Sequence, residues 1–219
     1  MWQNLLFDLD GTLTNSAEGI TKCVQYGLHS LGLEEENLQK LEVFIGPPLR
    51  ASYMKYYGLT REEAEAAVAA YRVRFEKVGW KENMAYPGIE ELLQALHQQH
   101  YRLGICTGKP EYFAVPIARR FGLQPYLETI TGSTLDGKMD DKAQVVQLAL
   151  KRWQLTSPEA KARTLLIGDR REDVLAAHAN GIACLGVGYG FGSQAELEEV
   201  GAEGYVATVD QLRSYLLQQ

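Results

Sequence analysis

Apolar residues along the chain follow two alternating patterns, which predict strands followed by helices. Short and almost continuous apolar runs are typical of strands buried on both faces. Such runs occupy residues 5–9, 103–106, 164–167 and 183–187. Between them the apolar positions recur at helical spacing, as they do between residues 89 and 96. This alternation predicts an α/β fold class, a Rossmann-like parallel sheet core with helices on both faces.

Residues 15–84 interrupt the alternation with a helical stretch that contains no strand-like run. A capping box at residues 60–63 begins one of its helices, and the segment Gly46-Pro47-Pro48-Leu49 is a rigid turn that a helix interior excludes. We therefore predict that residues 1–14 and 85–219 form the α/β core. Residues 15–84 are expected to form an inserted helical cap.

Composition narrows the class of protein and its partners. The 28 acidic residues outnumber the 22 basic ones, giving a formal net charge of −6, and this balance argues against a nucleic-acid partner. No run approaches the roughly 18 consecutive apolar residues of a membrane span, so no membrane partner is expected. The N-terminus lacks a signal-peptide pattern, and Cys23, Cys106 and Cys184 show no paired spacing. We expect free thiols and a cytoplasmic location.

Polar residues capable of chemistry follow the predicted strands. Ligands of an open parallel sheet bind at the carboxyl ends of its strands, so these side chains are expected to meet at one edge. The residues concerned are Asp8, Asp10, Thr107, Lys142, Asp169 and Asp173. Asp8 and Asp10 are two positions apart, a spacing that places both on the same side of an extended chain.

The charge of these carboxylates predicts a metal ion. Two like charges at 4 Å repel by about 4 kcal/mol at an effective dielectric constant of ~20, and Lys142 offsets only one of them. Because the ligands are carboxylate oxygens without nearby histidine or cysteine, the fitting cofactor is Mg²⁺. A magnesium site in turn predicts an anionic substrate.

Three other features near the predicted strand ends are weaker indications of a binding role. Lys138 competes with Lys142 for the anion-binding role, and we prefer Lys142 because an apolar helical run follows it directly. Lys109 is expected to be a surface lysine. The alternating glycines of residues 186–192 do not match the GxGxxG spacing, so we predict a flexible loop near the site and no dinucleotide cradle.

The motif residues resemble a known family. Asp8-Leu9-Asp10-Gly11-Thr12, Thr107, Lys142 and Gly168-Asp169-Arg170-Arg171-Glu172-Asp173 match, in order, the four motifs of the haloacid dehalogenase superfamily. The predicted cap lies where the helical cap of that superfamily is inserted. Within it, the Gly46–Leu49 turn and Thr107-Gly108-Lys109-Pro110 resemble the branch of phosphoglycolate phosphatases and 5′-nucleotidase-like proteins.

The resemblance implies a role for each site residue. Asp8 is the implied nucleophile, forming an aspartyl-phosphate, and Asp10 the implied general acid and base. Thr107 and Lys142 would bind the phosphoryl group, and Gly11 would turn its backbone N–H toward it. Gly108 is a further expected substrate contact, and Arg50, which follows the Gly46–Leu49 turn, is expected to line the cap side of the pocket. Mg²⁺ would be held by Asp8, the backbone carbonyl of Asp10 and Asp169, with Asp173 acting directly or through water.

These expectations together predict a phosphoric monoester hydrolase. The resemblance implies a Mg²⁺-dependent phosphatase acting on small phosphate monoesters, such as phosphoglycolate or a nucleoside monophosphate. Asp10 favours phosphate esters, because the dehalogenases and phosphonatases of the superfamily lack this aspartate. Two alternatives stay open: a phosphomutase acting on sugar phosphates, and a catalytically silent binding protein. The expected assembly is a monomer or homodimer.

Overall fold

The computed structural model describes residues 2–218 and divides into two compact units. One unit comprises Met1–Thr14 and Ala85–Gln219, and the other comprises Asn15–Met84. Two short strands, β2 (Thr14–Asn15) and β3 (Met84–Ala85), pair with each other where the chain passes from one unit to the other and back. The two units are described in turn.

The first unit is built on a six-stranded sheet with the order β5-β4-β1-β6-β7-β8. Each pair of neighbouring strands is parallel, which confirms the predicted α/β class. The strands are β1 (Asn4–Phe7), β4 (Arg102–Pro110), β5 (Thr129–Ser133), β6 (Thr164–Gly168), β7 (Ala183–Val187) and β8 (Gly204–Val206). The order reverses at β1, so β1 is the switch point beside which open parallel sheets bind ligands.

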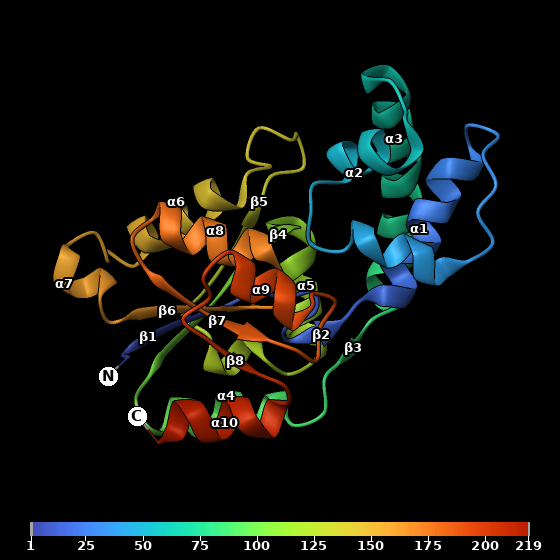
Figure 1. Cartoon of the computed structure of the whole chain (residues 1–219). Coiled ribbons are helices and arrows are strands. Elements are labelled where there is room, and N and C mark those ends of the chain that lie inside the picture. Colours follow the sequence, from blue (N-terminus) through green and yellow to red (C-terminus); the bar gives the residue numbers. More distant parts are fainter. Residues whose placement is uncertain (1, 219) are drawn as a thin grey trace. The chain divides into compact units, whose positions relative to one another are not determined.

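Helices cover both faces of this sheet (Figure 1). They are α4 (Ile89–Gln98), α5 (Glu111–Arg120), α6 (Lys142–Arg152), α7 (Pro158–Lys161), α8 (Arg171–Ala179), α9 (Gln194–Glu199) and α10 (Val209–Leu217), with a 3₁₀ turn η3 (Gln124–Tyr126). On one face α6 and α8 pack on alternate strand residues, including Leu6, Cys106 and Leu166. On the other face α4 packs against α10.

The strand register aligns the ends of the three central strands. Phe7 of β1 lies opposite Ile105 of β4 and Ile167 of β6. The residues that follow these three positions therefore lie side by side toward the carboxyl edge of the sheet. This alignment brings together segments from distant parts of the sequence.

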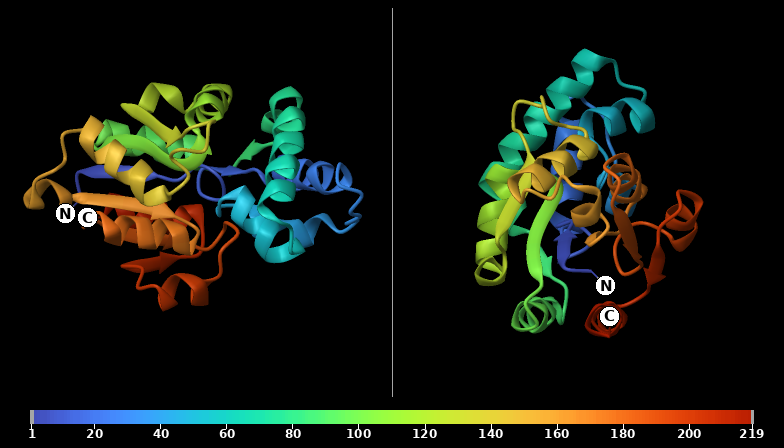
Figure 2. Two further views of the ribbon diagram at one scale, coloured as in Figure 1. Left: turned by 90° about the horizontal axis from the view of Figure 1, so that it is seen from above. Right: turned by 90° about the vertical axis from the view of Figure 1, so that its left-hand side faces the viewer.

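The second unit is helical and contains α1 (Ala17–His29), η1 (Leu38–Phe44), α2 (Leu49–Tyr57), α3 (Arg61–Lys77) and η2 (Gly79–Lys81). The capping box that begins α3 is present: Thr60 accepts a hydrogen bond from the Glu63 N–H, and Glu63 accepts one from the Thr60 N–H. Helix α1 packs against α3 (Figure 2). Within this unit, Tyr53 is buried and its hydroxyl donates to the Val24 carbonyl at 3.1 Å.

The cysteines and the helices bear on two further expectations. Cys23, Cys106 and Cys184 are buried thiols that form no disulfide, which confirms the expected thiols. Across residues 2–218, none of the helices combines the length and the apolarity needed to cross a bilayer.

Candidate active site

A tight turn after β1 positions Asp8 and Asp10. The Leu9 carbonyl accepts the N–H groups of Leu13 and Thr14, at 3.0 and 2.9 Å, which folds the chain back on itself. Gly11 makes this possible because its φ is +85°, a conformation that side chains disfavour. A Cβ at Gly11 would also overlap the Asp169 carboxylate, so only glycine leaves room for that acid.

The segment after β6 supplies Asp169 and Asp173. Asp169 follows the last strand residue, and Asp173 lies in the first turn of α8, where the N-terminus of a helix favours negative charge. The Arg170 N–H donates to Asp173 Oδ2 at 3.0 Å. A Cβ at Gly168 would overlap the Asp173 side chain, so this glycine permits the close approach of α8 to β6.

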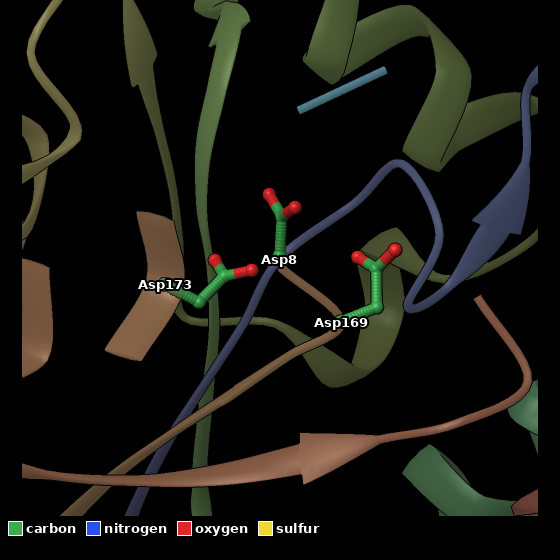
Figure 3. Close-up of side chains that lie close together, drawn as sticks. All are labelled: Asp8, Asp169 and Asp173. Atoms are coloured by element: carbon green, nitrogen blue, oxygen red, sulfur yellow. The ribbon is translucent and has the colours of Figure 1, made fainter. Parts of the chain in front are cut away.

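Three carboxylates converge at this edge of the sheet (Figure 3). Asp8, Asp169 and Asp173 each offer one oxygen, and these oxygens lie within 4.8 Å of one another. All three side chains are buried. Asp10 is outside this group, so its predicted part in a metal site would fall to its backbone carbonyl, the atom that the resemblance implies.

Lys142 is the cation next to the three carboxylates. Its Nζ lies 3.0 Å from Asp8 Oδ1 and also pairs with Asp173 Oδ1. Lys142 is the first residue of α6, where the Asp141 side chain caps the helix by accepting the Ala143 N–H. The preference for Lys142 over Lys138 is consistent with burial, because the Lys142 side chain is 10% exposed and that of Lys138 is 85% exposed.

The protonation of the cluster reflects its burial. Burial, together with the charges of Asp173 and Asp8, raises the pKa of Asp169 well above its ordinary value. Burial also raises the pKa of Asp173 to about 6, although Lys142 opposes the shift. Burial alone would lower the pKa of Lys142, but the Asp173 and Asp8 carboxylates raise it further than burial lowers it. The raised pKa values of Asp169 and Asp173 indicate that one lysine does not offset both the burial and the mutual repulsion of the three acids when they are ionised.

The donor set fits a hard divalent cation. Three buried carboxylates with oxygens in reach of one ion match the preference of Mg²⁺ for oxygen ligands, and no cysteine or histidine belongs to the group. A cation among them would also relieve the repulsion that adds to burial in raising the pKa values of Asp169 and Asp173. The residues present therefore suit the predicted cofactor.

Thr107 and Lys109 belong to β4, the strand next to β1. Thr107 is buried, and its hydroxyl accepts the Lys109 N–H at 3.2 Å, while Gly108 between them is partly exposed. The expectation that Lys109 is a surface lysine is wrong. Its side chain is 4% exposed, and its Nζ lies 2.6 Å from Asp10 Oδ2.

Two groups that support Asp169 were not singled out from the sequence. Asp169 Oδ2 accepts the Phe191 N–H at 2.8 Å, and Oδ1 accepts the Thr12 hydroxyl at 3.3 Å. Phe191 belongs to the glycine-rich loop that the sequence placed near the site. A Cβ at Gly190 would overlap the Gly11 carbonyl, so the loop glycines are the signal that pointed to this contact.

Arg50 belongs to the helical unit, in the first turn of α2. Its Nε lies 3.5 Å from Glu65 Oε1 of α3, within the same unit. Its expected contact with substrate stays a prediction, as do the substrate contacts of Gly11, Thr107 and Gly108.

Comparison with known proteins agrees with this geometry. A family model described as haloacid dehalogenase-like hydrolase matches residues 5–187. This chain belongs to the haloacid dehalogenase-like hydrolase family. A 5′-nucleotidase from Pseudomonas aeruginosa is 45% identical to it over 215 residues, 98% of this chain and 96% of that protein. The suspected superfamily is thereby confirmed.

Two further comparisons cover at least 98% of this chain. The crystal structure of a predicted phosphatase from Clostridium acetobutylicum matches with a TM-score of 0.95 at 42% identity, covering 100% of both chains. A Mycobacterium tuberculosis protein named tyrosine-protein kinase PtkA is 35% identical, covering 98% of this chain and 72% of that protein. The expected enzyme class, a phosphoric monoester hydrolase, is confirmed by the family and by its phosphatase relatives.

Proposed function

We propose that this hydrolase is a Mg²⁺-dependent phosphatase of small phosphate monoesters that works through an aspartyl-phosphate on Asp8. The observation that carries the proposal is the group of three buried carboxylates at the switch point of the sheet, with a single lysine among them. Such a site tolerates its own charge only with a further cation. A divalent cation together with Lys142 offsets the three carboxylates, so the site no longer repels a dianionic phosphate.

The residues of the chain divide the reaction into two steps. In the first, a carboxylate oxygen of Asp8 bonds to phosphorus, and the ester P–O bond breaks as Asp10 protonates the departing oxygen. In the second, Asp10 takes a proton from water, the water oxygen bonds to phosphorus, and the bond to Asp8 breaks to release inorganic phosphate. Lys142, fixed beside Asp8, holds a positive charge at the attacking carboxylate.

Mg²⁺ bound by Asp8, Asp169 and the Asp10 carbonyl, with Asp173 directly or through water, would neutralise charge on the phosphoryl oxygens. Thr107 has a buried hydroxyl whose oxygen already accepts the Lys109 N–H, which leaves its proton to donate to the substrate. Phosphoglycolate and nucleoside monophosphates are the proposed substrates, and residues 15–84 are proposed to act as the cap that selects among them.

The test is release of inorganic phosphate from a panel of small phosphate esters, with added Mg²⁺ and with a chelator. We expect turnover that the chelator abolishes, Mg²⁺ restores, and Asp8→Asn reduces by at least about a thousandfold, because the nucleophile is lost. The exposed substitution Asp136→Asn is the control and should retain full activity.

Other outcomes would replace the proposal. Isomerised sugar phosphate without released phosphate would support the phosphomutase. Label transferred from ATP to tyrosine would support the activity named for the mycobacterial relative. No turnover from a folded sample, or turnover indifferent to both the chelator and Asp8→Asn, would contradict the mechanism.

A further inference from the structure

A second buried ion pair lies beside the three carboxylates and takes no part in that group. Lys109 Nζ is 2.6 Å from Asp10 Oδ2, and the two side chains are 4% and 11% exposed. At this distance and with both side chains buried, the pair is a charge-assisted hydrogen bond that is shielded from water. Because holding a lysine in a buried position costs desolvation and side-chain entropy, the surroundings must fix it there.

The backbone of β4 fixes Lys109. Its pairing with β5 shifts register between Thr107 and Pro110, so the strand runs on past the regular ladder. The Lys109 N–H donates to the Thr107 hydroxyl at 3.2 Å. On the β5 side, a Cβ at Gly132 would come within 2.5 Å of the Lys109 carbonyl oxygen, so glycine lets the two backbones meet closely. The side chain of Lys109 is thereby directed at Asp10.

The two oxygens of Asp10 have different surroundings. Oδ2 is taken by Lys109, whereas Oδ1 is buried and has no hydrogen-bond partner within residues 2–218. Burying a carboxylate oxygen without a partner is costly, and such an atom in a site is ready to meet a group that arrives with the substrate. Lys109 therefore holds Oδ2 of Asp10 in place, and Oδ1 is left to contact the substrate.

We propose that Lys109 is a positioning residue for Asp10: it anchors Oδ2 so that Oδ1 is presented to the oxygen that leaves from phosphorus. The inference rests on the proposed function, in which Asp10 protonates that oxygen. Lys109 thus acts through Asp10, whereas Lys142 serves Asp8 and Asp173. The two lysines therefore affect different bonds: Lys142 the bond that forms to phosphorus, and Lys109 the bond that breaks.

The test compares two substrates that differ in their need for a proton on the leaving group. p-Nitrophenolate leaves without protonation, whereas the alkoxide of glycerol 3-phosphate does not. For Lys109→Met, we expect kcat/KM on glycerol 3-phosphate to fall by about 10- to 100-fold, a part of the ~10²–10⁴ that a positioned acid supplies. On p-nitrophenyl phosphate kcat/KM should fall less than about threefold, because this ratio reports the step in which the ester bond breaks and not the later hydrolysis of the aspartyl-phosphate that both substrates share.

Three companion variants make the result specific. Lys109→Arg keeps the charge in another geometry and should recover part of the loss on the alkyl ester. Adding Lys109→Met to Asp10→Asn should cost little beyond Asp10→Asn alone, because both act on one proton transfer. Lys138→Met, at an exposed lysine, is the matched control and should behave as wild type on both substrates. Thermal unfolding of each variant confirms that the compared samples are folded.

Equal losses of kcat/KM on both substrates, or full additivity with Asp10→Asn, would overturn this inference while leaving the proposed function intact. If Lys109→Met does not fold, the same comparison on Lys109→Arg decides: an equal loss on both esters overturns the inference. Hydrolysis of neither ester by the wild-type enzyme with Mg²⁺ would instead overturn the proposed function, and this inference with it.

Discussion

Two buried lysines pair with three of the four carboxylates of the site. Lys142 pairs with Asp8 and Asp173, and Lys109 pairs with Asp10. Removing one partner of a buried pair leaves a charge that neither water nor a counter-ion compensates, and such losses reach about 3–5 kcal/mol. Each lysine is therefore expected to contribute both to the stability of the fold and to the chemistry of the site.

We expect Lys142→Met to lose nearly all phosphatase activity and to lower the thermal unfolding temperature of the metal-free protein. The variant leaves Asp8, Asp169 and Asp173 without their lysine, so added Mg²⁺ should raise its unfolding temperature by more than it raises that of the wild type. Differential scanning calorimetry with and without Mg²⁺ measures both effects. An unfolding temperature equal to that of the wild type, in metal-free buffer, would contradict the charge argument.

At this scale the sequence predicted Lys142 but not Lys109. Lys142 begins a helix whose apolar pattern is local, so its place followed from the residues around it. Lys109 depends on the register shift between β4 and β5 and on the close approach of Gly132, which involve distant segments. Its separation of two positions from Thr107 was the available signal, since that spacing puts two strand residues on one face.

At the scale of elements, the site is formed mainly by closely packed turns and loops that follow the strands. The turn after β1, the end of β6 and the loop of residues 188–192 meet around Asp169. Gly11 and Gly190 leave the space that these backbones occupy. Because protein interiors are closely packed, even one added methyl group here must displace backbone.

We expect Gly190→Ala to lower both activity and stability, since its Cβ would overlap the Gly11 carbonyl and the Asp169 side chain. The predicted loss of stability is about 1–3 kcal/mol, the usual cost of overpacking. Steady-state kinetics at varied Mg²⁺ concentration should show that the variant needs more Mg²⁺ for half-maximal activity, because Asp169 is displaced.

Gly32→Ala is the control for this prediction. Gly32 has a φ of +75° and open space around it, so the substitution tests backbone strain without a clash. It should cost about 1 kcal/mol of stability and leave the activity of folded molecules unchanged. A Gly190→Ala enzyme with wild-type activity and metal dependence would show that the loop does not hold Asp169.

The elements themselves were largely predictable, and their mutual contacts were not. The four apolar runs that periodicity identified correspond to β1, β4, β6 and β7, because burial on one or two faces leaves a local pattern. β4 extends beyond the predicted run to Pro110, and the contact of Phe191 with Asp169 joins segments 22 residues apart. Such contacts leave no periodic signal.

For the whole molecule, the decisive feature is the strand order around β1. Neighbours β4 and β6 come from distant parts of the chain, and their parallel register brings Asp8, Thr107 and Asp169 to one edge. Alternating strands and helices predicted a parallel sheet, and the motifs predicted which strand ends matter. The order itself arises from long-range pairing, which the local pattern does not encode.

The acidic cluster gives the metal-free protein a defined response to pH. The pKa of Asp173 is about 6 in the folded protein and ordinarily 3.8, and that of Asp169 is also raised. Between pH 3.8 and about pH 6 the folded state binds more protons than the unfolded state. The free energy of unfolding therefore falls as the pH rises through this range. Mg²⁺ requires ionised carboxylates, so its binding strengthens over the same window.

We therefore expect the rise in unfolding temperature caused by Mg²⁺ to be larger at about pH 7.5 than at about pH 5, on either side of the Asp173 pKa of about 6. Thermal unfolding in matched buffers measures it, with Na⁺ at equal ionic strength as the control. A Mg²⁺ effect that is the same at both pH values, or one reproduced by Na⁺, would contradict a carboxylate metal site.

The three native thiols are sheltered from reagents. All are buried, and burial raises the pKa of Cys106 to about 12 and that of Cys184 well above its ordinary value, so the nucleophilic thiolate is scarce. Val73 in the helical unit and Leu175 in the sheet unit are each 49% exposed. Maleimide dyes would thus attach at Val73→Cys and Leu175→Cys without prior substitution of the native cysteines. Energy transfer between the two dyes would then report the distance between the two units during turnover.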